Sequence, residues 1–183
     1  MLPESGTIAV LAEKPSVARD IARILGATAR GDGYLHGNGY VVTWAIGHLV
    51  SLPQPHEIDP AWRRWSREKL PMLPRNWPLV VYEKTRDQFE VVKKILQSSR
   101  VARIVCATDA GREGELIFRY IYEAADCEKP VDRLWISSLT PDAIQDGIHV
   151  SMAFSLAYLV CMTMLIFSHR QYFFGDAPQE DAT

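Results

Sequence analysis

The chain has 183 residues, which is enough for one domain with its own hydrophobic core and a small appendage. It is 48% hydrophobic and 23% charged, as ordinary globular proteins are, and its formal net charge is −2. That charge excludes a general, strongly basic nucleic-acid binder. Any contact with DNA has to come from a local patch of Lys and Arg.

The cysteines and the N-terminus bear on the cellular compartment. Cys106, Cys127 and Cys161 are too far apart for a zinc knuckle, and their number is odd. The first residues, MLPESGTIAV, lack the basic start and the long apolar core of a signal peptide. Isolated thiols without a secretion signal are typical of a reducing environment, so we expect a cytoplasmic protein.

The first apolar run, residues 7–12 (TIAVLA), predicts a buried strand. Glu13 and Lys14 follow at its carboxyl end. A proline and a serine then begin a helix, because proline suits the first turn and serine can cap it. Apolar residues recur at helical spacing until Gly26 ends the helix.

The next segment predicts a hairpin, a strand and an insertion. Glycines within residues 31–39 indicate a turn that leads into a strand at residues 40–46, which Gly47 and His48 close. About residues 48–78 are rich in proline and contain three tryptophans. Because linkers are not rich in tryptophan, we expect an ordered surface insertion there.

The second half alternates strands with helices. Strands are predicted at residues 79–82, 101–107 and 133–136, and helices at 85–97, 111–125 and 142–148. The helix predicted at 111–125 should have five side chains that face inward, those of Leu116, Ile117, Tyr120, Ile121 and Ala124. This alternation predicts an α/β fold with a mainly parallel sheet that helices cover on both faces.

The C-terminal segment does not fit this pattern. Residues 150–167 (VSMAFSLAYLVCMTMLIF) form an apolar helix candidate of 18 uncharged residues, the lower limit for a membrane span. Its Ser, Thr, Cys and Met residues weaken the case for a span. We favour a non-native tail from a truncated or frameshifted reading frame. A membrane anchor and a helix docked on the sheet are the alternatives.

Polar residues gather at the carboxyl ends of the predicted strands, where open parallel sheets form their sites. Asp109 ends its strand, and Glu113 lies in the first turn of the next helix, so the two carboxylates can converge. Glu115 lies about 200° from Glu113 around that helix and cannot face the same ion. Two hard oxygen ligands suit Mg²⁺, which also takes water and substrate phosphate.

Other residues at the same edge would complete the chemistry. A carboxylic acid among carboxylates keeps its proton more readily, so Glu13 is a candidate general acid. Lys14 and Arg112 offer positive charge for a phosphate. Each feature alone has a simpler explanation, because the macrodipole favours acids in a first turn and His48 alone suits a structural role. Their joint occurrence after two apolar strands favours a site.

Three segments also carry a family resemblance. LAEKPSVARDIARIL, GNGYVVTWAIGHLVSL and ATDAGREGELIFRYIY resemble, in this order and spacing, the N-terminal Toprim domain of type IA DNA topoisomerases, in particular the bacterial topoisomerase III group. The resemblance covers residues 7–148 and includes LWISSLTPDAI, which is similar to the family's R-x-x-x-S-x-x-T/L-x-x-A-I stretch. Other Toprim proteins share a Glu and a D-x-D, but not these three segments together.

The resemblance implies a Mg²⁺-dependent acidic site. In the family, a tyrosine from another domain attacks a DNA phosphodiester and becomes linked to the 5′-phosphate. Glu13 corresponds to the glutamate that helps proton transfer at the 3′-hydroxyl, and Lys14 would stabilise charge at the phosphate. Both are therefore catalytic candidates.

The remaining matches concern metal and DNA. Asp109 and Glu113 correspond to the first Asp and the Glu of the family's D-x-D-x-E and would position the metal. Gly111 replaces the second Asp, which removes one ligand and one negative charge. His48 and Arg112 match positions on the face that binds DNA.

The expected domains are a Toprim domain over residues 1–148, with an insertion at about 48–78, and an unmatched tail over 149–183. Tyr158 and Tyr172 belong to no recognisable motif, so no nucleophile is assigned and the C-terminal topoisomerase domains would be missing.

The expected function is the Toprim portion of an enzyme that cleaves, passes and religates single-stranded DNA through backbone contacts, inactive alone. Two alternatives stay open. One is a non-catalytic module that binds nucleic acid or a partner, with or without a membrane tether, and the other is a Toprim nuclease. We do not expect membrane binding.

Overall fold

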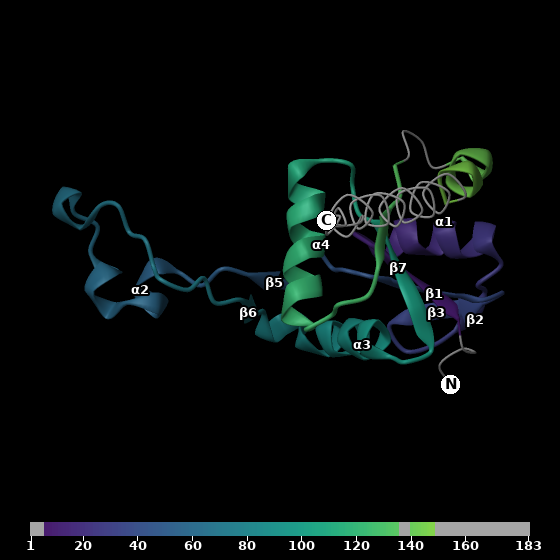
Figure 1. Ribbon diagram of the computed structural model, residues 1–183, viewed down its shortest axis with the longest axis horizontal. Coiled ribbons are helices and arrows are strands. Elements are labelled where there is room, and N and C mark those ends of the chain that lie inside the picture. Colours follow the sequence, from purple (N-terminus) through teal and green to yellow (C-terminus); the bar gives the residue numbers. More distant parts are fainter. Residues whose placement is uncertain (1–5, 136–139, 149–183) are drawn as a thin grey trace, which may run out of the picture.

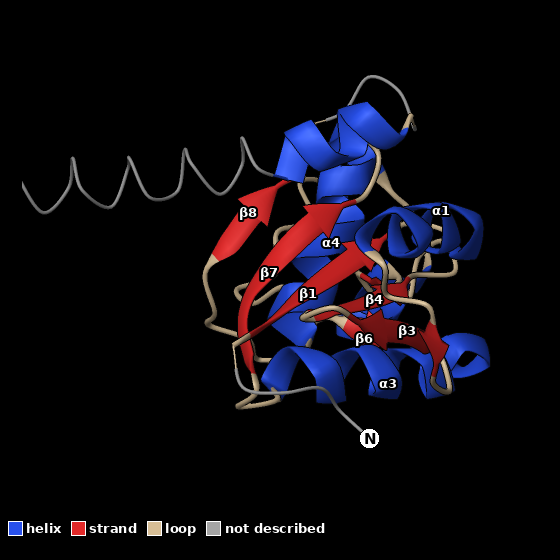
Figure 2. Cartoon of the chain, turned by 90° about the vertical axis from the view of Figure 1, so that its right-hand side faces the viewer, coloured by secondary structure: helices blue, strands red, loops and turns tan. Residues whose placement is uncertain are grey.

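The computed structural model describes residues 6–135 and 140–148. Six strands form the main sheet in the order β2-β3-β4-β1-β7-β8, with β4 and β1 at its middle (Figure 2). Their bounds are Thr7–Ala12 for β1, Ala29–Arg30 for β2, Tyr34–Gly37 for β3, Tyr40–Trp44 for β4, Val101–Ala107 for β7 and Val131–Arg133 for β8.

The strand directions confirm a mainly parallel sheet. Strands β4, β1, β7 and β8 run parallel to one another, and β2 and β3 add an antiparallel hairpin at one edge. Asn38 and Gly39 connect β3 to β4 with φ angles of 49° and 77°. Asn-Gly adopts this left-handed backbone readily, which is why the glycine-rich stretch forms a tight hairpin.

Helices cover both faces of the sheet, as predicted (Figures 1 and 2). Their bounds are Pro15–Leu25 for α1, Arg86–Gln97 for α3, Arg112–Ala124 for α4, and residues 141–148 for a last helix. Alternate residues of β1 point to opposite faces of the sheet and so belong to two different hydrophobic cores. Ala9 and Leu11 pack in one core with α3 and α4, and Val10 and Ala12 pack in the other with α1 and the last helix.

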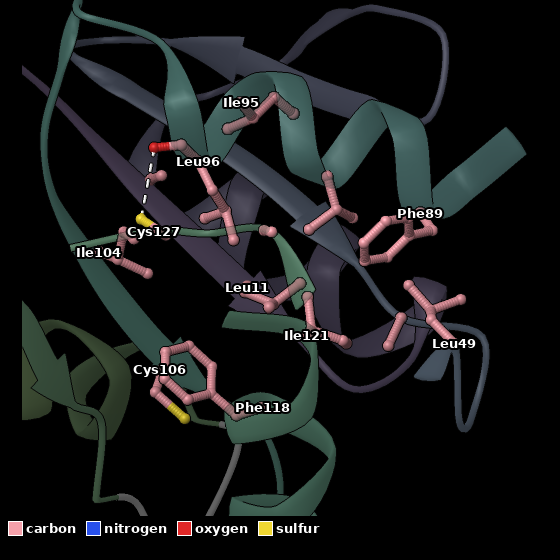
Figure 3. Packing of buried hydrophobic residues seen from close by; sticks show 14 of the residues in the cluster. Leu11, Leu49, Phe89, Ile95, Leu96, Ile104, Cys106, Phe118, Ile121 and Cys127 are labelled. Carbon is pink, nitrogen blue, oxygen red and sulfur yellow. Dashed lines mark hydrogen bonds between the residues drawn. The ribbon is translucent and has the colours of Figure 1, made fainter. Parts of the chain in front are cut away.

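The first of these cores fills the space between the sheet, α3 and α4 (Figure 3). Leu11, Ile104, Phe118 and Ile121 are fully buried there. Burial of such side chains stabilises the fold by about 1.5–3 kcal/mol each. The core therefore fixes α4 against the sheet, and α4 carries the acidic residues at its first turn.

The inward face of α4 differs in one residue from the prediction. Ile117 and Ile121 are buried as expected, together with Gly114 and Phe118. Leu116 is 42% exposed, so its predicted inward orientation was wrong. The reason is geometric, because Leu116 lies about 200° from Gly114 around the helix. Tyr120 and Ala124, from the same predicted set, are half-buried.

The proline- and tryptophan-rich segment projects away from the main sheet (Figure 1). Strands β5 (Val50–Ser51) and β6 (Val80–Val81) pair as a separate antiparallel sheet at its base. The strand predicted at 79–82 is thus shorter and lies outside the main sheet. Between β5 and β6 lie only short helical turns: α2 (Pro55–Ile58), η1 (Pro60–Arg63) and η2 (Arg67–Lys69), with η3 (Glu83–Thr85) leading into α3.

Two further predictions concern the C-terminal part. The strand predicted at 133–136 is β8, which begins and ends earlier, at Val131–Arg133. No helix within residues 6–135 and 140–148 is long and apolar enough to span a membrane. The apolar segment 150–167 and the rest of the tail, residues 149–183, lie outside the described residues.

A close backbone approach fixes the loop between β7 and α4. Thr108 Oγ1 donates a hydrogen bond to Gly114 O at 2.8 Å. A Cβ atom on Gly114 would lie 2.2 Å from Asp109 O, a distance that no side chain tolerates. Only glycine therefore lets α4 begin this close to the end of β7.

We expect Gly114→Ala to lower the free energy of unfolding by at least about 2 kcal/mol, because a backbone carbonyl has to move away from the new methyl group. Gly111→Ala is the matched control, since a Cβ there meets no atom within 4 Å and the residue has extended backbone. Its cost should stay near or below about 1 kcal/mol, the usual loss at a helix N-cap. Urea unfolding measures both, and equal losses would contradict the steric argument.

Candidate functional site

The parallel pairing of β1 with β7 brings two of the polar segments together. Ala12 is opposite Ala107 in the register, so the residues after both strands share one edge. The Asp109 N–H donates to Glu13 Oε2 at 3.2 Å. Lys14 Nζ lies 3.5 Å from Glu13 Oε1 and 3.8 Å from Asp109 Oδ2. Three residues predicted from the ends of two strands therefore form one cluster.

The members of this cluster differ in exposure. The Glu13 side chain is 12% exposed, whereas those of Lys14 and Asp109 are 57% and 66% exposed. Glu13 is thus held in place by the Asp109 backbone and the lysine. Lys14 and Asp109 present their charges to the solvent, where a substrate can reach them.

His48 forms a pair with Glu113, in the first turn of α4. His48 follows β4, and its Nε2 lies 3.4 Å from Glu113 Oε1, which is at the long end of hydrogen-bond distances. Gly47, with φ of 66°, provides the left-handed turn before it. The two predicted metal ligands are therefore paired separately, Asp109 with Lys14 and Glu113 with His48.

Mg²⁺ is the ion that the carboxylates at this edge would suit. Among residues 6–135 and 140–148, no three His, Cys, Asp or Glu side chains are grouped closely enough to hold a metal ion. Mg²⁺, however, needs only one or two protein carboxylates besides water and substrate phosphate. Asp109 and Glu113 provide such oxygens, and with exposures of 66% and 80% their side chains are free to turn. The residue types at this edge thus fit the ion.

Gly111 and Arg112 begin α4. Gly111 is the N-cap residue, with φ of −143° and open space around it, so the position has room for a larger side chain. Arg112 lines an open hollow beside residues 108–111, the loop from β7 to α4, which we call the acidic loop because it carries Asp109. Its other lining residues are Ala110, Gly111, Glu115, Leu116, Arg119, Arg133 and Trp135.

Glu115 does not take part in the acidic cluster. Its carboxylate accepts from Arg119 Nε at 2.7 Å and from Arg133 Nη1 at 3.1 Å. The prediction that Glu113 and Glu115 cannot face the same ion is in line with these different partners.

Arg133 was missed by the sequence analysis. Its guanidinium contacts Thr108, the Asp109 carbonyl and the Cys106 Sγ atom. Burial raises the pKa of the Cys106 thiol, and this outweighs the opposite effects of Thr108 and Arg133. The thiol is therefore neutral near pH 7. The sequence did offer a signal for Arg133, because it stands at the arginine that begins the family's R-x-x-x-S-x-x-T/L-x-x-A-I stretch.

Comparisons with known proteins give matches over about three quarters of the chain. The Toprim domain family matches residues 8–139. The DNA topoisomerase 3 of Shouchella clausii is 57% identical over 139 residues, which are 76% of this chain and 19% of that protein. The DNA topoisomerases 3 of Bacillus cereus and Bacillus subtilis are each 53% identical over 138 residues, 75% of this chain and 19% of theirs.

The chain thus spans about a fifth of the length of these relatives. The Toprim match begins within the first strand of the sheet and extends past the last one. It includes the acidic cluster, His48 and the start of α4. The chain therefore belongs to the Toprim domain family and is, over these residues, homologous to bacterial DNA topoisomerase 3.

Proposed function

We propose that this domain supplies the metal- and phosphate-handling part of a type IA DNA topoisomerase of the topoisomerase III kind. The observation that carries the proposal is the cluster of Glu13, Lys14 and Asp109 at the carboxyl ends of two parallel strands. It combines one shielded carboxylate, one exposed carboxylate and one exposed ammonium within reach of a single phosphodiester. Single-strand cleavage, passage and religation would be the activity of the full-length enzyme.

Glu13 and Lys14 are the proposed catalytic residues. Glu13 is largely shielded from water, and one of its oxygens is held by the Asp109 N–H. It would move a proton to and from the 3′-oxygen that leaves and returns. Lys14 is exposed and would place its positive charge against the phosphate during the same step.

Asp109 and Glu113 would hold Mg²⁺, which supplies positive charge at the phosphate oxygens when bound. Their present partners, Lys14 and His48, are exposed side chains that can give way. Gly111 leaves the site one carboxylate short of the family pattern. We therefore expect weak binding of the ion without DNA.

DNA contacts are assigned to His48, which pairs with Glu113, and to Arg112, which lines the hollow beside the loop after β7. Contacts of this kind go to the phosphate backbone and position a strand without reading its sequence. They would bind single-stranded DNA locally, which agrees with a chain whose net charge is −2. The site would then need no broad basic surface.

The nucleophile is proposed to lie outside this domain. Residues 1–148 would form the Toprim unit, with the projecting segment as its insertion. The partners would be DNA and the remaining domains of a full-length cytoplasmic enzyme. The acidic cluster positions and polarises a phosphate, which raises its reactivity only when something attacks it.

Mn²⁺, used as a paramagnetic substitute for Mg²⁺, should broaden the amide NMR signals of Asp109 and Glu113 first, with Glu13 close behind. Asp109→Asn combined with Glu113→Gln should abolish this local effect, because both carboxylate ligands are lost. Broadening that centres elsewhere, or survives the double substitution, would show that the metal assignment is wrong.

Gly111→Asp should tighten Mn²⁺ binding in the same titration, by about tenfold, because it restores a carboxylate with extended backbone and open surroundings. Gly111→Asn is the control, since it has nearly the same shape without the charge. No difference between the two variants would mean that residue 111 faces away from the ion.

This chain alone should not relax negatively supercoiled plasmid at any concentration with Mg²⁺ present. Relaxation needs a nucleophile to hold the cut end and a gate that opens for the passing strand. Agarose gels measure the topoisomers, and a denaturing lane without protease detects a covalent protein–DNA adduct.

Three outcomes of that assay are informative. A ladder of topoisomers would overturn the prediction. An adduct lost in Tyr158→Phe or Tyr172→Phe would place a catalytic tyrosine in the tail. Nicking without an adduct would favour a Toprim nuclease instead.

A further inference from the structure

A single guanidinium, from Arg133 at the end of β8, joins the end of β7 to the acidic loop. Its Nη2 donates to Thr108 O at 3.1 Å and to Asp109 O at 2.6 Å. Its Nη1 donates to Thr108 Oγ1 at 2.9 Å and to Glu115 Oε2 at 3.1 Å. The side chain is only 20% exposed, so these bonds are largely shielded from water.

Asp109 is consequently held at both of its backbone polar groups. Its N–H donates to Glu13 Oε2, and its carbonyl accepts from Arg133 and from the Gly111 N–H at 2.8 Å. Fixing both adjoining peptide planes fixes the Cα–Cβ direction. The direction in which the Asp109 carboxylate leaves the loop is therefore set by the backbone and not by the side chain's own contacts.

We propose that Arg133 is a positioning residue that aims the Asp109 carboxylate towards Lys14 and the substrate edge. The proposal rests on the proposed function, in which that carboxylate binds the metal ion. Within residues 6–135 and 140–148, Arg133 forms no hydrogen bond or ion pair with Lys14, His48 or Arg112. It acts through two main-chain carbonyls of the loop.

A simpler role for Arg133 would be to neutralise the charge of Glu115. The contacts of the neighbouring Arg119 argue against this role. Arg119 already donates to Glu115 Oε1 at 2.7 Å and touches neither loop carbonyl. What Arg133 adds is the pair of carbonyl contacts. A planar guanidinium can serve Thr108 O, Asp109 O and Glu115 together, whereas the compact ammonium of lysine cannot span all three.

The test compares Arg133→Gln and Arg133→Lys with Arg119→Gln, all in the full chain. The first measurement is amide hydrogen exchange without metal. Exchange at Asp109 and Gly111 should become about tenfold faster or more in Arg133→Gln, because charge-assisted bonds to the loop are lost. Arg133→Lys should show a smaller increase. Arg119→Gln should leave both amides as in the wild type.

The second measurement is the Mn²⁺ titration, in which the direction of the change in Mn²⁺ affinity distinguishes a charge effect from a positioning effect. Loss of a positive charge near carboxylates would by itself strengthen binding of a cation. Loss of positioning weakens it, and we expect about tenfold weaker binding in Arg133→Gln, the equivalent of one lost charge-assisted hydrogen bond. Arg119→Gln, which removes the same charge nearby, should bind Mn²⁺ as well as the wild type or better.

The proposal fails if exchange at Asp109 and Gly111 is unchanged in both Arg133 variants, or if Arg119→Gln accelerates it equally. It also fails if Arg133→Gln binds Mn²⁺ more tightly. If Arg133→Gln loses protection throughout β1 and α1 as well, it has unfolded, and Arg133→Lys decides. A wild type without broadening at Asp109 would refute the metal assignment of the proposed function, while the exchange data would still decide the role of Arg133.

Discussion

The parallel pairing of β1 with β7 is the constraint on which the candidate site depends. The register that sets Ala12 opposite Ala107 brings two turns to the same edge of the sheet. Both strands are buried on both faces, so a shift of one residue would exchange the two cores. The hydrophobic patterning of β1 therefore determines that Glu13 meets the Asp109 backbone, although neither residue belongs to a core.

The loop after β7 then converts this pairing into a defined geometry. Gly114 lets the first turn of α4 approach the Asp109 carbonyl, and Arg133 binds that carbonyl from β8. Flexibility is left to the exposed side chains of Lys14, Asp109 and Glu113. A rigid backbone with mobile charged groups suits a site that has to bind and release a long anionic strand.

Much of the fold and part of the site could be predicted from the sequence, for identifiable reasons. Glu13, Lys14 and Asp109 follow apolar strands, and parallel strands place their ends together. Arg133 could not be found in this way, because its role depends on carbonyls that only the folded loop presents. Leu116 was misplaced because an apolar residue on a helix is no proof of burial.

In the proposed function, the net charge of the site makes binding of the metal ion and binding of DNA depend on each other. Glu13, Asp109 and Glu113 against Lys14 sum to −2 when all four are ionised. A phosphate approaching that edge is repelled, and Lys14 alone cannot offset the repulsion. The other nearby acid, Glu115, is already neutralised by Arg119 and Arg133. A divalent cation and a DNA phosphate would therefore each bind more tightly in the presence of the other, and thermodynamic linkage makes this effect reciprocal.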